Sequence, residues 1–516
     1  MAAISSNGTT GNWTGANTAI WTGGVVPTAA DDVTITSGSV LTIPSSTTAV
    51  CRSLTINSGA TLAFAASTST LNIGDGTAGA GNVALSINSG STITLTGIGT
   101  INFVSTSATQ QTITTNGKVM PSININGAGS SYILSDTLTM DTSSVATTLT
   151  IQNGTFDTGN YNITGNIFNT ATGTKTITLG SSAISLARNG AALSWVTTNL
   201  TVTANTAVIT FTASATVNTG SVNFNGASFT FTGSGTKTIT GAATAKDLTV
   251  TGTATQTEYL TLGANITCTG TFTVTGNSAI NRPTVQSDVL GTARTITAAN
   301  TSLTNCDFMD ITGAGAASWS GTTVGDRQGN SGITFTTPAT QTRDSTSGSA
   351  WSVAARWTSR VPLPQDDVVL NASSGSISST NVLVLGKNID MTNYAGTITL
   401  TTNASIFSIY GSLNLGGVTW GAAVNTFNID FMGRGSHTIT SNGKTFFPAA
   451  SNQTVRINAF GGTYTLADAF TQNVPASTGI SFNLIAGSFA TSNYNMSIGR
   501  FVTSGSLPAL QLGEQV

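Results

Sequence analysis

The chain of 516 residues is short of charge. Aspartate, glutamate, lysine and arginine together make up 7% of it, whereas ordinary soluble domains contain about 25%. The 17 basic and 19 acidic residues nearly cancel, which leaves a net charge of −2. Without a basic excess, the chain lacks the charge pattern of a nucleic-acid-binding protein and has no polybasic segment for an anionic membrane. We therefore expect uncharged polar partners, such as a glycan, or other proteins.

Cysteine and histidine are also scarce. The three cysteines, Cys51, Cys268 and Cys306, lie far apart and form no C-x-x-C pair, so we expect buried free thiols. A Ser-His-Asp triad would need the one histidine, His437, for which we predict an exposed position in a strand. No HExxH, GxSxG, P-loop or dinucleotide-binding motif occurs. The sequence thus predicts no enzyme activity and no cofactor.

Long apolar runs are missing as well. No segment approaches the roughly 18 residues that cross a membrane, so we expect no membrane insertion. The first residues, MAAISSNGTTGNW, contain neither a basic region nor an apolar core, and we predict that they are not a signal peptide. No segment of helical length has a period of 3.6 residues, so we predict no significant helix.

Short strand patterns fill the sequence instead. Runs of about four to six residues alternate apolar and polar side chains and end in Gly, Asn or Ser, as at 40–43, 92–95 and 175–179. The segment LTINSGATL (54–62) recurs as LSINSGSTI (85–93), 31 residues later. Such spacing favours stacked coils that share one core over a closed sandwich. We therefore predict an all-β fold, a right-handed parallel β-helix or β-solenoid.

In addition to the short repeat, the sequence contains a larger duplication. The segments TITTNGK (112–118) and GTFDTGNYN (154–162) recur as TITSNGK (438–444) and GSFATSNYN (487–495). We predict tandem copies of one module, and Tyr132 and Tyr464, at equivalent places, should pack rather than bind sugar. The expected domains are a first solenoid module at 1–183, continuing solenoid at 184–335, a linker at 336–350 and a second copy of the module at 351–516.

Both copies open with the order Trp, Trp, Pro, Asp-Asp-Val, which we interpret as a structural cap. Tryptophan supplies an apolar lid, proline fixes a turn and aspartate accepts hydrogen bonds from turn amides. Adjacent strand residues point to opposite faces, so an Asp-Asp pair does not form the facing carboxylates of a glycosidase. The cap residues are Trp13, Trp21, Pro27, Asp31 and Asp32 in the first copy and Trp351, Trp357, Pro362, Asp366 and Asp367 in the second.

Three aspartates are weak candidates for a metal site. Asp307, Asp310 and Asp326 are close in sequence and would suit Ca²⁺ or an acidic cleft. Their spacing does not match a calcium loop of the form D-x-[DN]-x-[DN]-G, so we predict no metal site. Thr-x-Thr triplets, such as Thr92–Thr94, occur at irregular intervals, and we interpret them as solvated strand faces rather than an ice-binding surface.

The stretch 233–335 includes GSGTKTITG, CDFMDITGAGAASWSG and GDRQGNSGITF, and it resembles repeat-rich virion-associated proteins of marine and environmental tailed phages. The segment RWTSRVPLPQDDV (356–368) is similar to the same group. The resemblance implies a structural protein of a fibre, spike or appendage at the virion surface, assembled in the host cytoplasm without a signal peptide. The implied partners are other virion structural proteins, further copies of this chain, commonly as a homotrimer, and host-surface glycans.

Two other functions remain open on the sequence. One is a bacterial or archaeal surface adhesin or filament subunit, in which copies would stack end to end. The other is a tailspike-like polysaccharide depolymerase, which would need two carboxylates about 5–10 Å apart in a cleft. The region from Asp307 to Asp326 is where such a cleft is expected.

Overall fold

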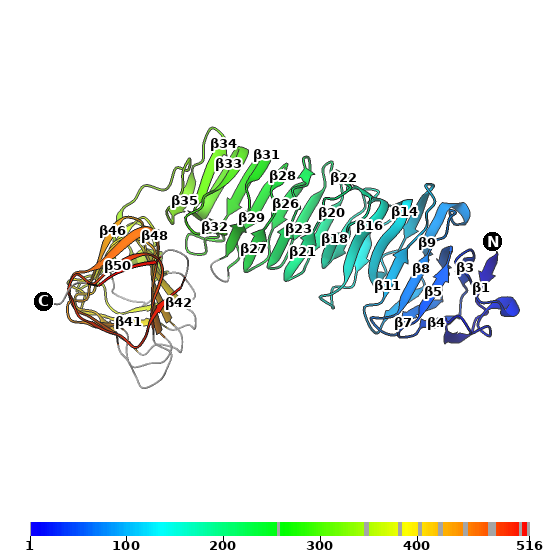
Figure 1. Cartoon of the computed structure of the whole chain (residues 1–516), viewed down its shortest axis with the longest axis horizontal. Helices are drawn as coiled ribbons and strands as arrows, with labels where there is room; N and C mark the ends of the chain where they lie inside the picture. Colours follow the sequence, from blue (N-terminus) through cyan, green and yellow to red (C-terminus); the bar gives the residue numbers. More distant parts are fainter. Residues whose placement is uncertain are drawn as a thin grey trace. The chain divides into compact units, whose positions relative to one another are not determined.

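The computed structural model describes nine segments of the chain. Within them, helical structure is confined to the short 3-10 turns η1 (Thr22–Gly24), η2 (Ala80–Asn82) and η3 (Ala354–Arg356). The strands stack in parallel as a β-solenoid of about 18 turns (Figure 1), which confirms the predicted all-β solenoid. The described residues are 2–254, 258–344, 350–379, 384–400, 405–421, 427–446, 453–472, 481–504 and 508–512.

Each early coil contributes one strand to each of three walls, and each strand pairs in parallel with strands of the coils before and after it. The first wall contains β1 (Ala3–Ser5), β3 (Asp32–Ile35), β6 (Ser53–Ile56), β9 (Val83–Ile87), β12 (Gln110–Thr114), the second half of β14 (Ser122–Leu134), the second half of β16 (Thr148–Asp157), β19 (Lys175–Thr178), β22 (Leu200–Thr203), β25 (Asn223–Phe224), β28 (Ala243–Ala245) and the start of β31 (Ile266–Thr275).

Among the described residues, no strand pairing joins β22 to β25 in the first wall, whereas the second wall is paired throughout and the third is built in two sections. The second contains β5 (Thr48–Cys51), β8 (Thr70–Ile73), β11 (Thr100–Phe103), the first halves of β14 and β16, β18 (Ile167–Thr170), β21 (Gly190–Ser194), β24 (Ala215–Asn218) and β27 (Thr236–Ile239). The third contains β2 (Thr10–Asn12), β4 (Val40–Ile43), β7 (Thr61–Phe64) and β10 (Thr92–Leu95), then β13 (Val119–Met120), β15 (Leu138–Met140), β17 (Ile163–Gly165), β20 (Ala183–Leu186), β23 (Val208–Phe211), β26 (Ser228–Phe231) and β29 (Leu248–Thr251).

The later strands repeat this arrangement. The series β30 (Tyr259–Leu262), β32 (Thr284–Ser287), β33 (Arg294–Met309) and β35 (Gly321–Asp326) is accompanied by β34 (Ile311–Gly315). The remaining strands are β36 (Thr340–Thr342), β37 (Asp367–Val369), β38 (Ile377–Ser379), β39 (Val384–Gly386), β40 (Ile389–Asp390), β41 (Thr397–Leu400), β42 (Ser405–Ile409), β43 (Leu413–Asn414), β44 (Thr419–Trp420), β45 (Phe427–Phe431), β46 (Ser436–Thr440), β47 (Thr445–Phe446), β48 (Gln453–Leu466), β49 (Phe470–Gln472), β50 (Ser481–Ala490), β51 (Met496–Ser497), β52 (Phe501–Thr503) and β53 (Pro508–Gln511).

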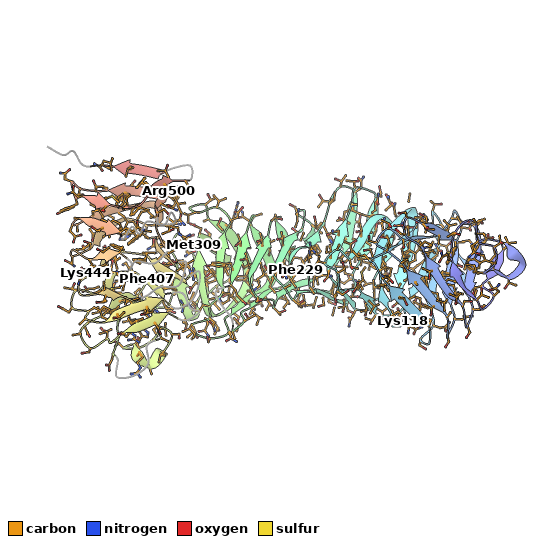
Figure 2. All side chains as sticks on the ribbon, turned by 90° about the horizontal axis from the view of Figure 1, so that it is seen from below. Lys118, Phe229, Met309, Phe407, Lys444 and Arg500 are labelled. Atoms are coloured by element: carbon orange, nitrogen blue, oxygen red, sulfur yellow. The ribbon has the colours of Figure 1, made fainter. Side chains whose placement is uncertain are left out.

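The core is formed by every second residue of each strand, because alternate side chains point into the solenoid. In β8 the apolar residues Leu71 and Ile73 are fully buried, while Thr70 and Asn72 face outward. The short sequence repeat is one coil laid on the next, because Leu54 pairs with Leu85 and Ile56 with Ile87. Aromatic residues such as Phe229 fill the interior of later coils (Figure 2). Each coil thus shares its buried side with its neighbours, as the repeat predicts.

The segment 336–350 is not a simple linker. Within it, Thr340–Thr342 forms β36 and pairs with β37, as β1 pairs with β3 in the first copy. Gln341 and Arg343 are fully buried. The linker interpretation is wrong for this part because its polar composition hid a strand that begins the second copy. Residues 345–349 lie outside the described residues.

Contacts between residues divide the chain into two compact units. The other predicted domain boundaries stay predictions. The first unit consists of Met1–Val250, Gly263–Phe272 and Thr297–Ala299, and the second of Thr251–Leu262, Thr273–Ile296 and Asn300–Val516.

Candidate functional site: aspartates, caps and a polar pocket

The first cap is held by Asp31. Its Oδ1 accepts a hydrogen bond from the Ala2 amide at 2.9 Å, and its Oδ2 accepts bonds from the Thr28 amide and hydroxyl at 3.0 and 2.7 Å. The Thr28 hydroxyl, helped by both amides, holds the pKa of the Asp31 carboxyl below its usual value. Trp13 and Trp21 pack edge to face with centroids 5.1 Å apart. Asp31 therefore closes the turn that begins at Thr28 and ties it to Ala2, which directly precedes the first strand, and the tryptophan pair supplies apolar packing.

The second cap repeats these contacts. Asp366 accepts hydrogen bonds from the Ala339 amide at 2.8 Å and the Leu363 amide at 2.9 Å, and it also pairs with Arg360. The rings of Trp351 and Trp357 lie 4.6 Å apart in an edge arrangement. In both caps the first aspartate accepts a hydrogen bond from the amide three residues earlier. Asp31 accepts from Thr28, and Asp366 accepts from Leu363.

The remaining cap residues also have internal roles. Pro27 and Pro362 are buried. Asp32 pairs with Arg52 and accepts a bond from the Ser53 hydroxyl at 2.5 Å. Asp367 accepts a bond from the Asn388 side-chain amide at 2.8 Å. These carboxylates join one coil to the next and are not directed toward a shared substrate position.

Asp307 is the most buried of the metal candidates. Its carboxylate lies between Arg282, whose Nε is 2.7 Å from Oδ1, and Arg327, whose Nη2 is 3.0 Å from Oδ2. Burial alone would raise the pKa of Asp307, but the two guanidinium groups lower it below its usual value. Because both oxygens of this ionised carboxylate are paired with arginines, we interpret Asp307 as a residue that stabilises the fold rather than a metal ligand.

Asp310 and Asp326 have partners of their own. Asp310 accepts a bond from the Gly291 amide at 2.9 Å and pairs with Arg434 at 2.6 Å. Oδ1 of Asp326 accepts bonds from the Gln328 amide at 2.7 Å and the Asn330 side chain at 2.8 Å. Across the described segments, no three His, Cys, Asp or Glu side chains gather as a metal ion would require.

The cysteine prediction is confirmed. For His437 the predicted strand is confirmed, since it lies in β46, but the predicted exposure is wrong. All three cysteines are buried free thiols, and burial raises the pKa of Cys268 to about 12. His437 is half-buried rather than exposed, because its ring packs 5.2 Å from that of Tyr464. Its Nε2 lies 3.1 Å from the carbonyl oxygen of Arg434. Burial lowers the pKa of this histidine.

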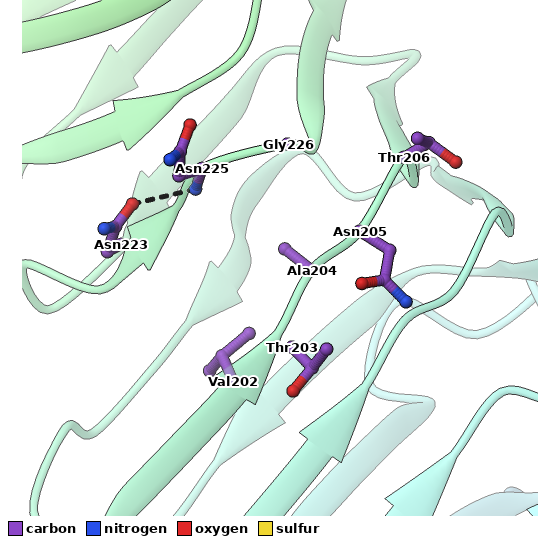
Figure 3. Close-up of a pocket in the computed structure, with 8 residues that line it drawn as sticks. All are labelled: Val202, Thr203, Ala204, Asn205, Thr206, Asn223, Asn225 and Gly226. Atoms are coloured by element: carbon purple, nitrogen blue, oxygen red, sulfur yellow. Dashed lines mark hydrogen bonds between the residues drawn. The ribbon is translucent and has the colours of Figure 1, made fainter.

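The structure also contains a pocket that sequence reasoning missed. It has a volume of about 720 Å³ and lies where β22 meets the turns before β23 and after β25 (Figure 3). In the preceding strand the inward residues Lys175 and Ile177 are fully buried, but their partners in β22, Leu200 and Val202, are only half-buried. The next strand in contact, β25, has only two residues and leaves this part of the wall uncovered.

The pocket has an apolar floor and a polar, uncharged rim. Val202 and Ala204 are the apolar residues of the lining. Outside the lining, Trp195 packs against Phe224 of β25 with ring centroids 4.9 Å apart, and its Nε1 donates to the Phe168 carbonyl at 3.1 Å. The only sequence signals were the turn-forming segments TANT (203–206) and NFNG (223–226). The lining residues are Val202, Thr203, Ala204, Asn205, Thr206, Asn223, Asn225 and Gly226.

Backbone conformation fixes the rim. Asn205 has φ of 46° and Gly226 has φ of 106°. A Cβ on Gly226 would lie 2.1 Å from the Asn205 carbonyl oxygen, so the two turns stack closely. Asn223 accepts a bond from the Asn225 amide at 2.8 Å, and Asn225 accepts one from the Thr269 hydroxyl at 3.1 Å. The rim is thus held before any ligand arrives.

The fold places the chain in the class of parallel β-solenoid proteins. Comparison with known proteins gives no match to a family model, a curated protein or a solved structure. In the part of the chain that the structure describes, none of the helical turns has the length and apolar character of a membrane span.

Proposed function

We propose that this chain is a structural protein of a bacteriophage virion, part of a fibre, spike or surface appendage, with adhesion to host-surface glycans. The supporting observation is the recurrence of one solenoid module, with the same strand register and the same buried tyrosine contact in both copies. The Tyr132 hydroxyl accepts a bond from the Ser105 amide at 3.0 Å, and the Tyr464 hydroxyl accepts one from the Gly433 amide at 2.9 Å. Duplication of whole coils lengthens a solenoid without a new core. The phage assignment itself rests on the sequence resemblance.

The use of charge supports a structural role. The aspartates considered for chemistry are engaged in ion pairs or turn contacts inside the solenoid, as Asp307 and Asp366 illustrate. The depolymerase alternative places a carboxylate pair at Asp307–Asp326, but Asp307 is fully buried between two arginines. No observation on these residues favours that alternative. The adhesin or filament subunit remains the alternative that the same fold supports.

The composition of purified particles tests the virion assignment. Antibodies against the recombinant chain should label intact phage particles by immunogold microscopy, and mass spectrometry should find its peptides in the particles. Finding the chain instead on the surface of uninfected cells would favour the adhesin. Sedimentation of the pure chain separates the assembly states, because we expect a discrete homotrimer. A concentration-dependent series of larger species would contradict the trimer and favour a filament subunit.

A further inference from the structure

We propose that the pocket lined by residues 202–206 and 223–226 binds a neutral oligosaccharide. This inference rests on the adhesion element of the proposed function and assigns it to one site. The pocket belongs to the first unit and is lined by short turns joined directly to stacked strands, which hold a binding surface more firmly than a long loop does.

The free hydrogen-bonding groups of the rim match sugar hydroxyls. Among the described residues, the side chains of Thr203, Asn205 and Thr206 have no hydrogen-bond partner, and each faces solvent. Amides and hydroxyls both donate and accept, as sugar hydroxyls do. The Asn223 side-chain amide adds a further donor beside them, since only its oxygen is used in the turn. The rim therefore offers several donors and acceptors within one sugar-sized opening.

The lining also indicates which ligands the pocket disfavours. None of the lining residues is charged, so a sulfated, phosphorylated or uronate-containing ligand would lose hydration without gaining an ion pair. Val202 and Ala204 provide a small apolar floor against which the C–H face of a sugar ring can lie. A neutral ring with hydroxyls at its edge satisfies both the floor and the rim.

A track of hydroxyls leads away from the pocket along the first wall. Thr201 and Thr203 pair with Thr176 and Thr178 of the preceding coil. These pair in turn with Thr155, which continues the row of hydroxyls, and with Asp157, a carboxylate at which the row ends. Neighbouring parallel strands are about 4.8 Å apart, so side chains on successive coils form a regular row. We infer that the ligand is a linear oligosaccharide whose further residues lie along this row.

The test uses the full-length chain on an array of neutral and acidic oligosaccharides, followed by calorimetry with the best neutral ligand. The pocket variants are Thr203→Val combined with Thr206→Val, and Asn205→Asp, which keeps a residue type that tolerates positive φ. The control is Thr92→Val combined with Thr94→Val, which alters two exposed strand threonines elsewhere. Losing two hydrogen bonds should weaken binding about tenfold or more, while the control stays within about twofold of wild type.

Each outcome decides a different point. Selective binding of neutral glycans that is insensitive to salt and lost in the pocket variants supports the proposal. Binding that persists in those variants, with their folding verified by circular dichroism, overturns the pocket and leaves adhesion in place. A preference for acidic glycans overturns the assignment of a neutral ligand to the pocket. No binding of any glycan overturns both the pocket and the adhesion element, whereas the particle-composition test decides the virion assignment independently.

Discussion

At the scale of single residues, two buried tyrosine hydroxyls show how polar groups bond across neighbouring coils. Tyr132 is fully buried, packs 5.2 Å from Phe103 and accepts the Ser105 amide. Tyr464 is equally buried and packs 4.9 Å from Phe431. The predicted packing role of these tyrosines is confirmed. A donor left without its acceptor in such surroundings costs free energy because no water replaces the tyrosine.

Tyr132→Phe should therefore destabilise the protein by about 1–3 kcal/mol, since the buried Ser105 amide loses its acceptor. Burial raises the pKa of Tyr132 to about 12, so this hydroxyl stays protonated through the neutral range. Tyr161→Phe, at an exposed tyrosine, is the control and should change stability by less than about 0.5 kcal/mol. Urea unfolding curves measure both, and equal effects would contradict the role of the buried bond.

Asp307→Asn should lower the stability of the fold more than Tyr132→Phe does. It removes the charge between Arg282 and Arg327 and leaves two buried guanidinium groups uncompensated, at a cost of about 3–5 kcal/mol. Because the pKa of Asp307 is lowered in the folded state, its stabilisation is present above the pKa of an unfolded aspartate, about 3.9. That stabilisation is lost as the pH falls through the lower folded value.

Melting temperatures of wild type and Asp307→Asn, measured against pH, check this prediction. The difference between them should be full near neutral pH and shrink only in strongly acidic solution. Asp288→Asn, which breaks the exposed pair with Arg294, serves as the control and should cost less than about 1 kcal/mol. A constant difference down to the lowest pH at which the protein folds would show that the charge of Asp307 is unimportant.

At the scale of elements, the two copies preserve the same irregularity. The pairing of β14 with β16 shifts register after Ile125, and that of β48 with β50 shifts after Ile457. Side chains change more freely than this geometry does. The amides of Asn102 and Asn124 lie 3.4 Å apart in the first copy, and the ion pair of Asp430 with Arg456, at 2.5 Å, takes their place in the second.

In both copies a glycine lies next to this register shift, and we predict that replacing it destabilises the protein. Gly154 has φ of 86° and Gly487 has φ of 87°. A Cβ on Gly154 would lie 2.6 Å from the Gly127 carbonyl oxygen, and one on Gly487 would lie 2.1 Å from the Ala459 carbonyl oxygen. Either Gly→Ala change should cost at least about 2 kcal/mol from strain and overlap. Gly15→Ala, with open space around it, should be nearly neutral in thermal unfolding.

At the scale of the whole molecule, the two compact units predict unfolding that is not two-state. Tyr132 belongs to the first unit and Tyr464 to the second. In calorimetry we expect Tyr132→Phe and Tyr464→Phe to lower different transitions, because each removes a contact within its own unit. If both variants move a single transition by the same amount, the units unfold together and this prediction fails.

The sequence by itself determined the strands, the coil repeat and the duplication, because alternation and spacing are written locally along the chain. Leu54 and Leu85 needed only their shared motif to be placed on adjacent coils. Tertiary structure alone decided which polar groups meet. Asp307 between two arginines, the burial of His437 against Tyr464 and the strand within 336–350 all depend on register between coils. The pocket beside Asn205 belongs to this second group, because it exists only where the short β25 leaves β22 uncovered.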